Sequence, residues 1–211
     1  MQVQMLLKKA SALDIKMICP LHSLIIRKNI NLFIEKYDKW SSYTPEENSV
    51  LIAFSSVYGG TENTAEILAG KLADKGIKNI KMYDVSYINH SIILAEAFKA
   101  SHIILATTTY NAGVFESMQA FIHSLVSHNL QNRKFFLIEN GSWAPTCGGQ
   151  MKAELEKLKG SDFLTASLCI KSTIKEDKLA ELDNVVITIE KSLNKYTIKG
   201  LKTCFNPFII N

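Results

Sequence analysis

Apolar and polar residues follow two repeating patterns from Ser49 onward. Unbroken apolar runs such as Val50 to Phe54 are typical of strands buried on both faces of a parallel sheet. The stretches between these runs place apolar residues three and four positions apart, which predicts amphipathic helices. The predicted strands are 50–54, 79–85, 102–107, 134–139 and 163–170, and the predicted helices are 62–75, 91–99, 115–127, 149–159 and 176–193.

Strands that alternate with helices through short loops predict an α/β fold with right-handed crossovers. Five such units fit a three-layer, doubly wound five-stranded parallel sheet in the flavodoxin-like order 2-1-3-4-5. In this order a ligand binds where the connections change direction. We therefore expect a ligand at the carboxyl ends of strands 1, 3 and 4.

The two flanks of this body follow other patterns. Residues 6–13 and 31–40 predict short helices and residues 15–18 a short strand, which is too little to form a separate core. Residues 41–48 read as a polar linker. The predicted organisation is a separate segment at 1–45, a body at 46–193 and a C-terminal tail at 194–211.

The charge distribution argues against a nucleic-acid partner. The 211-residue chain carries a net charge of +4, but residues 46–191 hold 14 basic and 17 acidic side chains. The excess positive charge therefore lies in the flanks, whereas a nucleic-acid surface needs basic residues gathered on the folded body.

Apolar content and cysteine spacing indicate the compartment. The sequence has no run of about 18 apolar residues, so no membrane span is expected. Its N-terminus lacks the pattern of a secretory signal. Four widely separated cysteines predict free thiols in a reducing cytoplasm, and they are Cys19, Cys147, Cys169 and Cys204.

The loop after the first predicted strand is typical of an anion site. Ser55 to Thr61 contains hydroxyls and two glycines directly before a helix, whose first N–H groups and dipole attract negative charge. Neither a Walker A ending nor a G-x-G-x-x-G pattern is present, and residues 50–70 contain no Lys or Arg. This favours a permanently held phosphate monoester. The alternative is an ordinary strand-to-helix turn with Thr61 as its cap.

Two further loops bring unusual residues to the same edge of the predicted sheet. Residues 107–115 contain hydroxyls, an aromatic and a glycine, and residues 140–149 contain Trp143 among small and turn-forming residues. A tryptophan in such a loop is expected to cover a flat ring system. For Tyr110, packing back onto a helix is an equal alternative.

No catalytic side chain stands out beside these loops. Cys147 has no His or Asp at fixed spacing, so we interpret it as a small bystander thiol. His123 and His128 near a helix end favour solvated or capping roles, and no metal site is predicted. Any chemistry is therefore expected from a bound cofactor.

Three loops and one flanking segment carry a family resemblance. Ser56 to Thr61, with the loops at Thr107 to Phe115 and Asn140 to Trp143, resembles the FMN-binding domain of flavodoxins. More narrowly, residues 49–193 look like the carboxyl-terminal domain of the flavodiiron (A-type flavoprotein) family. Residues 19–27, Cys-Pro-Leu-His-Ser-Leu-Ile-Ile-Arg, are similar to that family's P-x-H-G-x-I-W-R segment, and the Tyr and Trp that follow it match Tyr37 and Trp40.

The resemblance makes residues 1–45 the end of a metallo-β-lactamase-like diiron domain, with His22 in the place of the last iron ligand. Ser23 and Ile26 stand where the family has Gly and Trp, and the chain contains no H-x-E-x-D-H run. One histidine cannot hold two irons, so the chain by itself is expected to lack diiron reductase activity.

The resemblance also implies which residues bind FMN. The phosphate would be held by side-chain hydroxyls and backbone N–H groups, while two other loops edge and cover the ring and ribityl chain. The implied residues are Ser56, Val57, Tyr58, Gly59, Gly60, Thr61, Thr107, Thr108, Thr109, Tyr110, Asn111, Gly113, Val114, Phe115, Asn140, Gly141, Ser142 and Trp143.

The leading functional hypothesis is an electron-transfer flavoprotein. Gly113 would allow a peptide near Ala112-Gly113 to turn toward the flavin. The alternatives are an NAD(P)H-dependent flavin or quinone reductase and a non-catalytic fragment acting as an interaction module. The resemblance implies a redox protein partner, rubredoxin-like or a reductase, and it leaves a homodimer open.

Overall fold

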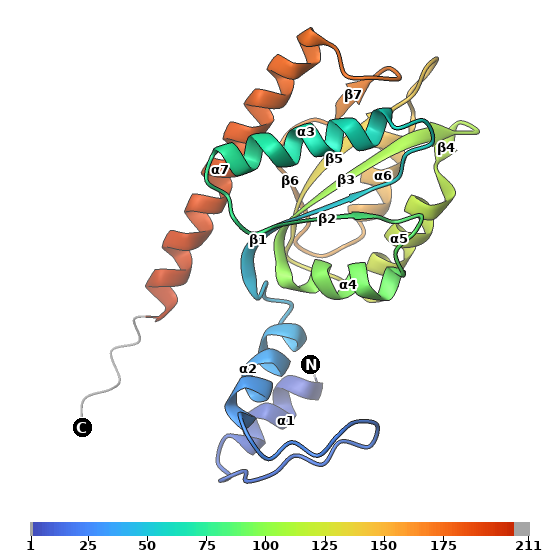
Figure 1. The fold of residues 1–211 in the computed structure, drawn as a ribbon. Coiled ribbons are helices and arrows are strands. Elements are labelled where there is room, and N and C mark those ends of the chain that lie inside the picture. Colours follow the sequence, from blue (N-terminus) through green and yellow to red (C-terminus); the bar gives the residue numbers. More distant parts are fainter. Residues whose placement is uncertain (1, 205–211) are drawn as a thin grey trace.

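A computed structural model describes residues 2–204, with side chains as far as Lys195 (Figure 1). The last residues of the predicted tail, 205–211, and the side chain of Cys204 lie outside the described part. The elements are α1 (Gln2–Ala10), α2 (Ile30–Ser41), β1 (Glu47–Phe54), α3 (Gly60–Asp74), β2 (Ile80–Asp84), α4 (His90–Lys99), β3 (Ala100–Tyr110), β4 (Gly113–Val114), α5 (Glu116–Ser127), β5 (Lys134–Asn140), α6 (Cys147–Leu155), β6 (Asp162–Phe163), β7 (Leu168–Ile170) and α7 (Glu176–Cys204).

The sheet has the parallel architecture that the sequence predicts. Its strands lie in the order β2-β1-β3-β5-β6, and β7 pairs with β5 further along. The predicted fifth strand is thus divided into β6 and β7, both parallel to β5. Phe135 pairs with Phe163 and Ile138 with Leu168, so two extra residues on this edge interrupt the ladder. Counted by predicted strands, the order is 2-1-3-4-5.

Alternate residues of the central strands bury against different helix layers. Ile52 on β1 belongs to the cluster that includes α3 and α7, whereas Leu51 and Ala53 belong to the cluster that includes α4, α5 and α6. Figure 1 shows these two helix layers on opposite sides of the sheet. Burial on both faces explains why the strands read as unbroken apolar runs.

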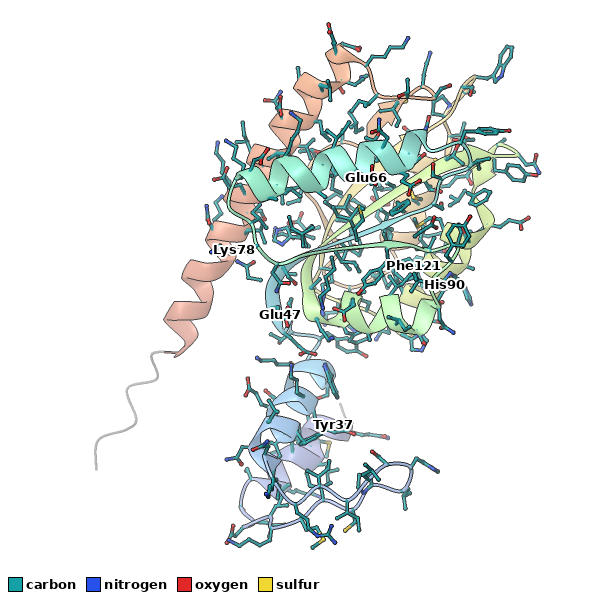
Figure 2. All side chains as sticks on the ribbon, viewed as in Figure 1. Tyr37, Glu47, Glu66, Lys78, His90 and Phe121 are labelled. Carbon is teal, nitrogen blue, oxygen red and sulfur yellow. The ribbon has the colours of Figure 1, made fainter. Side chains whose placement is uncertain are left out.

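The His90 side chain makes two contacts at the start of α4. The His90 ring lies against Phe121 of α5 at 5.7 Å between centroids in an edge-to-face arrangement (Figure 2). Its Nε2 is 3.0 Å from the Val85 carbonyl oxygen. The aromatic contact joins α4 to α5, and the polar contact links the start of α4 to the loop after β2.

Several element boundaries differ from the sequence predictions. Helix α6 begins at Cys147 and ends at Leu155, whereas the predicted helix spans 149–159. Helix α7 continues to Cys204, eleven residues beyond the predicted end at Leu193. The predicted strand at 15–18 is wrong, since only an isolated bridge joins Ile18 to Ile26. A strand forms only where a neighbouring strand supplies a ladder of partners, and a single bridge does not.

Residues 2–41 form a small helical unit below β1 (Figure 1). None of the described residues of α1 or α2 is buried. Gln4 of α1 donates to Asp38 and Ser41 of α2 at 2.9 and 2.8 Å. Tyr37, labelled in Figure 2, packs edge-on against Trp40 in this unit at 5.4 Å between ring centroids. The unit is held by polar and partly exposed contacts.

Candidate functional site

A cavity of about 870 Å³ opens at the carboxyl ends of β1, β3 and β5. This size is within the range of small-molecule sites. None of its described lining residues carries a charged side chain. The lining residues are Ser56, Val57, Tyr58, Gly59, Gly60, Thr61, Asn63, Thr108, Thr109, Tyr110, Ala112, Asn140, Gly141, Ser142, Trp143, Ala144, Ser172 and Thr173.

The turn between β1 and α3 forms one wall of this cavity. Gly59 adopts φ 82° as the N-cap, a conformation that glycine enters without a steric penalty. Helix α3 therefore begins at Gly60, before the predicted start at Glu62, and the N-cap is Gly59 where the alternative interpretation had Thr61. The N–H groups of the first helical turn lie at this wall, where they lack intrahelical acceptors.

Two adjacent serines in this turn have different environments. The Ser55 hydroxyl is buried and lies 2.6 Å from Thr107 Oγ1. The Ser56 Oγ is also buried, yet among the described residues it has no hydrogen-bond partner. A buried hydroxyl without a partner is costly unless something else satisfies it. Ser56 lines the cavity, so a bound oxygen-rich group is the natural partner.

Asn140, at the end of β5, joins three parts of the cavity wall. Its Nδ2 donates to Thr61 Oγ1 at 3.1 Å and to the Ser172 carbonyl at 3.0 Å. Its Oδ1 accepts the Ser172 N–H at 2.9 Å. The side-chain amide thus extends the pairing of β5 with β7 and fixes the loop before α7 over the first turn of α3.

Gly60 permits this close approach. A Cβ at position 60 would lie 1.9 Å from the Ser172 carbonyl oxygen, far inside van der Waals contact. Ser172 itself has φ 64°, and it adds a wall with Thr173 that the sequence did not predict. In the sequence, a short polar stretch after the last strand is the only feature that marks this wall.

Aromatic side chains surround the mouth. Tyr58 and Trp143 are 99% and 95% exposed, so neither ring packs on the protein. Tyr110 is half exposed and meets Phe115 edge-on at 5.8 Å between centroids. Rings held at a cavity mouth with free faces can stack on a flat ligand.

The structure brings most of the predicted site residues together. Residues 56–61, 108–110 and 140–143 all line the cavity. Thr107 is fully buried behind the wall, paired with Ser55. The other predicted residues outside the lining are Asn111, Gly113, Val114 and Phe115. They support the wall through the β3–β4 hairpin, in which Tyr110 pairs with Gly113 and Thr109 with Val114.

Cys147 lies close to the site but is shielded. Its thiol is fully buried and donates to the Thr107 carbonyl at 3.7 Å. Burial raises the pKa of this thiol, which disfavours the reactive thiolate. The described part of the chain contains no group of three His, Cys, Asp or Glu side chains that could hold a metal ion.

Comparison with known proteins identifies the fold. The chain superimposes on the flavodiiron protein of Giardia intestinalis with a TM-score of 0.85 at 21% identity, over 94% of this chain and 49% of that one. An archaeal flavodoxin matches 69% of this chain over 99% of its own, with a TM-score of 0.61 at 17% identity. The fold is flavodoxin-like.

Sequence relatives point to the same group of proteins. The rubredoxin-oxygen oxidoreductase of Megalodesulfovibrio gigas is 26% identical over 148 residues, which cover 69% of this chain and 36% of the relative. An uncharacterised protein of Methanocaldococcus jannaschii is 30% identical over 116 residues, or 55% of this chain and 29% of the relative. The chain is thus similar in sequence to a rubredoxin-oxygen oxidoreductase and similar in fold to a flavodiiron protein and a flavodoxin.

The matches have clear limits in extent. No family model matches the chain. The aligned part spans about a third of these two curated relatives and about half of the Giardia structure. None of the described helices combines the length and apolar character that crossing a membrane requires.

Proposed function

We propose that the cavity binds FMN non-covalently and that the protein is an electron-transfer flavoprotein. The observation that carries the proposal is the buried Ser56 Oγ without a partner, beside the first turn of α3. A phosphate there would accept from this hydroxyl and from the helix N-terminus. None of the described lining residues is charged, so the phosphate would be held by hydroxyls and backbone N–H groups alone. This suits a phosphate monoester that is kept in place and not transferred.

The remaining walls suit the rest of the cofactor. Tyr58 and Trp143 present free aromatic faces at the mouth, and Thr108 and Tyr110 also line the cavity. Bound FMN would supply one- and two-electron transfer. The residues of this chain would hold the phosphate, orient the ring and limit its contact with water.

The visible absorption spectrum of the purified protein, before and after FMN is added, tests this proposal. We expect a yellow protein, or a colourless one that becomes yellow and quenches FMN fluorescence at a stoichiometry of one. A protein that stays colourless and leaves FMN fluorescence unchanged would contradict the proposal and favour a non-catalytic interaction module.

An NAD(P)H-dependent flavin or quinone reductase is the second candidate. The Trp143 ring is 95% exposed, so in this arrangement it does not close the cavity to a nicotinamide. Rapid mixing of the FMN-loaded protein with NADH separates the two candidates. Fast bleaching of the flavin supports the reductase, and a slow or absent change supports electron transfer between proteins.

We further propose the organisation and context that the sequence predicts. Residues 1–45 would be the end of a metallo-β-lactamase-like domain, 46–193 the FMN domain and 194–211 a tail. A rubredoxin-like protein or a reductase would be the redox partner, in line with the name of the Megalodesulfovibrio gigas relative. The described cysteines are free thiols, which supports a reducing compartment such as the cytoplasm.

A further inference from the structure

The turn between β3 and β4 has a strained backbone. Asn111 and Ala112 have φ values of 48° and 56°, and Tyr110 pairs with Gly113 across them. A two-residue hairpin turn with two positive φ angles usually carries Asn followed by Gly. Here the second position is Ala, whose Cβ makes this conformation unfavourable. Other contacts must therefore hold the turn in place.

Those contacts come from the start of α6. The Ala112 carbonyl accepts hydrogen bonds from Thr146 Oγ1 at 3.1 Å and from Gln150 Nε2 at 2.7 Å. In return, Thr109 Oγ1 accepts the N–H groups of Thr146 and Cys147 at 3.0 and 3.3 Å. The hairpin and the first turn of α6 thus support each other through four hydrogen bonds.

Only one side of this arrangement faces the cavity. Tyr110 and Ala112 line the cavity, whereas Gln150 and Thr146 lie outside its lining. We propose that Thr146 and Gln150 are positioning residues, which hold the Ala112 carbonyl against α6 and so fix the cavity edge formed by Tyr110 and Ala112. This inference rests on the proposed function, since FMN is the ligand whose ring the edge would position. An edge that is ordered before binding avoids an ordering cost when the ligand binds.

The ligand-free protein provides the first test. The amide signal of Gly113 reports directly on the Ala112–Gly113 peptide in backbone NMR spectra. We expect a double variant, Thr146→Val with Gln150→Ala, to shift and broaden this signal, while Thr146→Ser keeps the hydroxyl and the wild-type signal. Gln119→Ala, an exposed glutamine of α5, is the matched control. Circular dichroism establishes that all variants are folded.

The second test uses FMN as the probe. Because both exposed hydrogen bonds to the Ala112 carbonyl are lost, we expect the double variant to bind FMN roughly three- to tenfold more weakly than wild type. The midpoint potential of the bound flavin should also shift, whereas Thr146→Ser and Gln119→Ala should match wild type in both measurements.

The two tests distinguish the failure of this inference from the failure of the proposed function. A wild-type protein that does not bind FMN overturns the proposed function, and with it the role of the edge in positioning FMN. A wild type that binds FMN, with a double variant unchanged in Gly113 signal, affinity and potential, overturns the positioning role alone.

Discussion

Ser55 and Ser56 lie next to each other at the end of β1 but have different roles, one in the core and one at the cavity. The Ser55 hydroxyl pairs with Thr107 inside the core, while the Ser56 Oγ is buried beside the cavity without a partner among the described residues. Removing the first hydroxyl leaves Thr107 unsatisfied, and removing the second leaves no protein group unsatisfied. Substitutions at the two positions should therefore have opposite effects.

We predict that Ser56→Ala weakens FMN binding about ten- to a hundredfold, since a hydrogen bond to a charged group contributes about 1.5–3 kcal/mol. The stability of the ligand-free protein should be unchanged or slightly raised. Ser55→Ala should lower the free energy of unfolding by about 1–3 kcal/mol. Fluorescence titration and urea unfolding measure the two effects, and weaker FMN binding in Ser55→Ala alone would contradict the assignment.

Two glycines of α3 provide a second contrast. A Cβ at Gly60 would meet the Ser172 carbonyl at 1.9 Å, whereas a Cβ at Gly70 would meet nothing within 4 Å. Gly60→Ala should cost about 1–3 kcal/mol of unfolding free energy, because the loop before α7 must move. Gly70→Ala should stabilise the helix by about 0.5–1 kcal/mol. Equal unfolding midpoints for the two variants would show that Ser172 does not pack on α3.

At the scale of elements, a buried histidine connects α7 to the end of the sheet that lies opposite the cavity. His102 of β3 is 1% exposed, and its two ring nitrogens lie 2.8 Å from Ser101 Oγ and 2.9 Å from Ser192 Oγ of α7. Burial, with a smaller contribution from Lys134, lowers the pKa of His102 to about 4. The neutral imidazole is therefore part of the folded contact.

This pKa predicts a pH-dependent stability. An unfolded histidine takes up its proton near pH 6.5, well above the folded value, so the unfolded state gains protons first as the pH falls. Stability should be complete above pH 6.5 and decline toward pH 4, with about 2 kcal/mol lost between pH 7 and pH 5.

Urea unfolding at pH 7, 6 and 5 measures this decline. His102→Gln should be less stable at pH 7 but show a flatter dependence on pH. His123→Gln, at an exposed position of α5, should retain the wild-type slope. A slope that persists in His102→Gln would assign the effect to other groups.

At the scale of the whole molecule, the N-terminal unit and the body differ in how many of their residues are buried. The described buried core lies within residues 49–193, and none of the described residues before Ser49 is buried. The unit meets the body through Lys36 and Trp40, which contact Glu46. The buried Arg133 also donates to the Tyr43 carbonyl at 2.8 Å.

We predict that a chain beginning at Ser42 folds and binds FMN as the full chain does. Its melting temperature should fall by no more than about 2–4 °C, because none of the described residues that it loses is buried. Thermal unfolding with a parallel FMN titration measures both quantities. A larger loss of stability would mean that α1 and α2 support the body more than their exposure indicates.

Local patterns determined much of this architecture. Apolar runs and helical periodicity predicted the parallel sheet, and chain connectivity then restricted its strand order. The turn at residues 55–61 could also be predicted, because hydroxyls and glycines between a strand and a helix are typical of an anion site. The sequence did not predict the boundaries of α6 and α7 or the division of the last strand, because these features depend on the neighbouring elements.

The sequence by itself thus determined the parallel fold and the position of the turn between β1 and α3. Only the tertiary structure decided that Asn140 binds Thr61 and Ser172, and that Gln150 supports Ala112. These partners lie more than 30 residues apart in the chain, and no pattern of spacing marks them. They meet because parallel strands bring their carboxyl ends to one edge of the sheet, where the loops that follow must pack against each other.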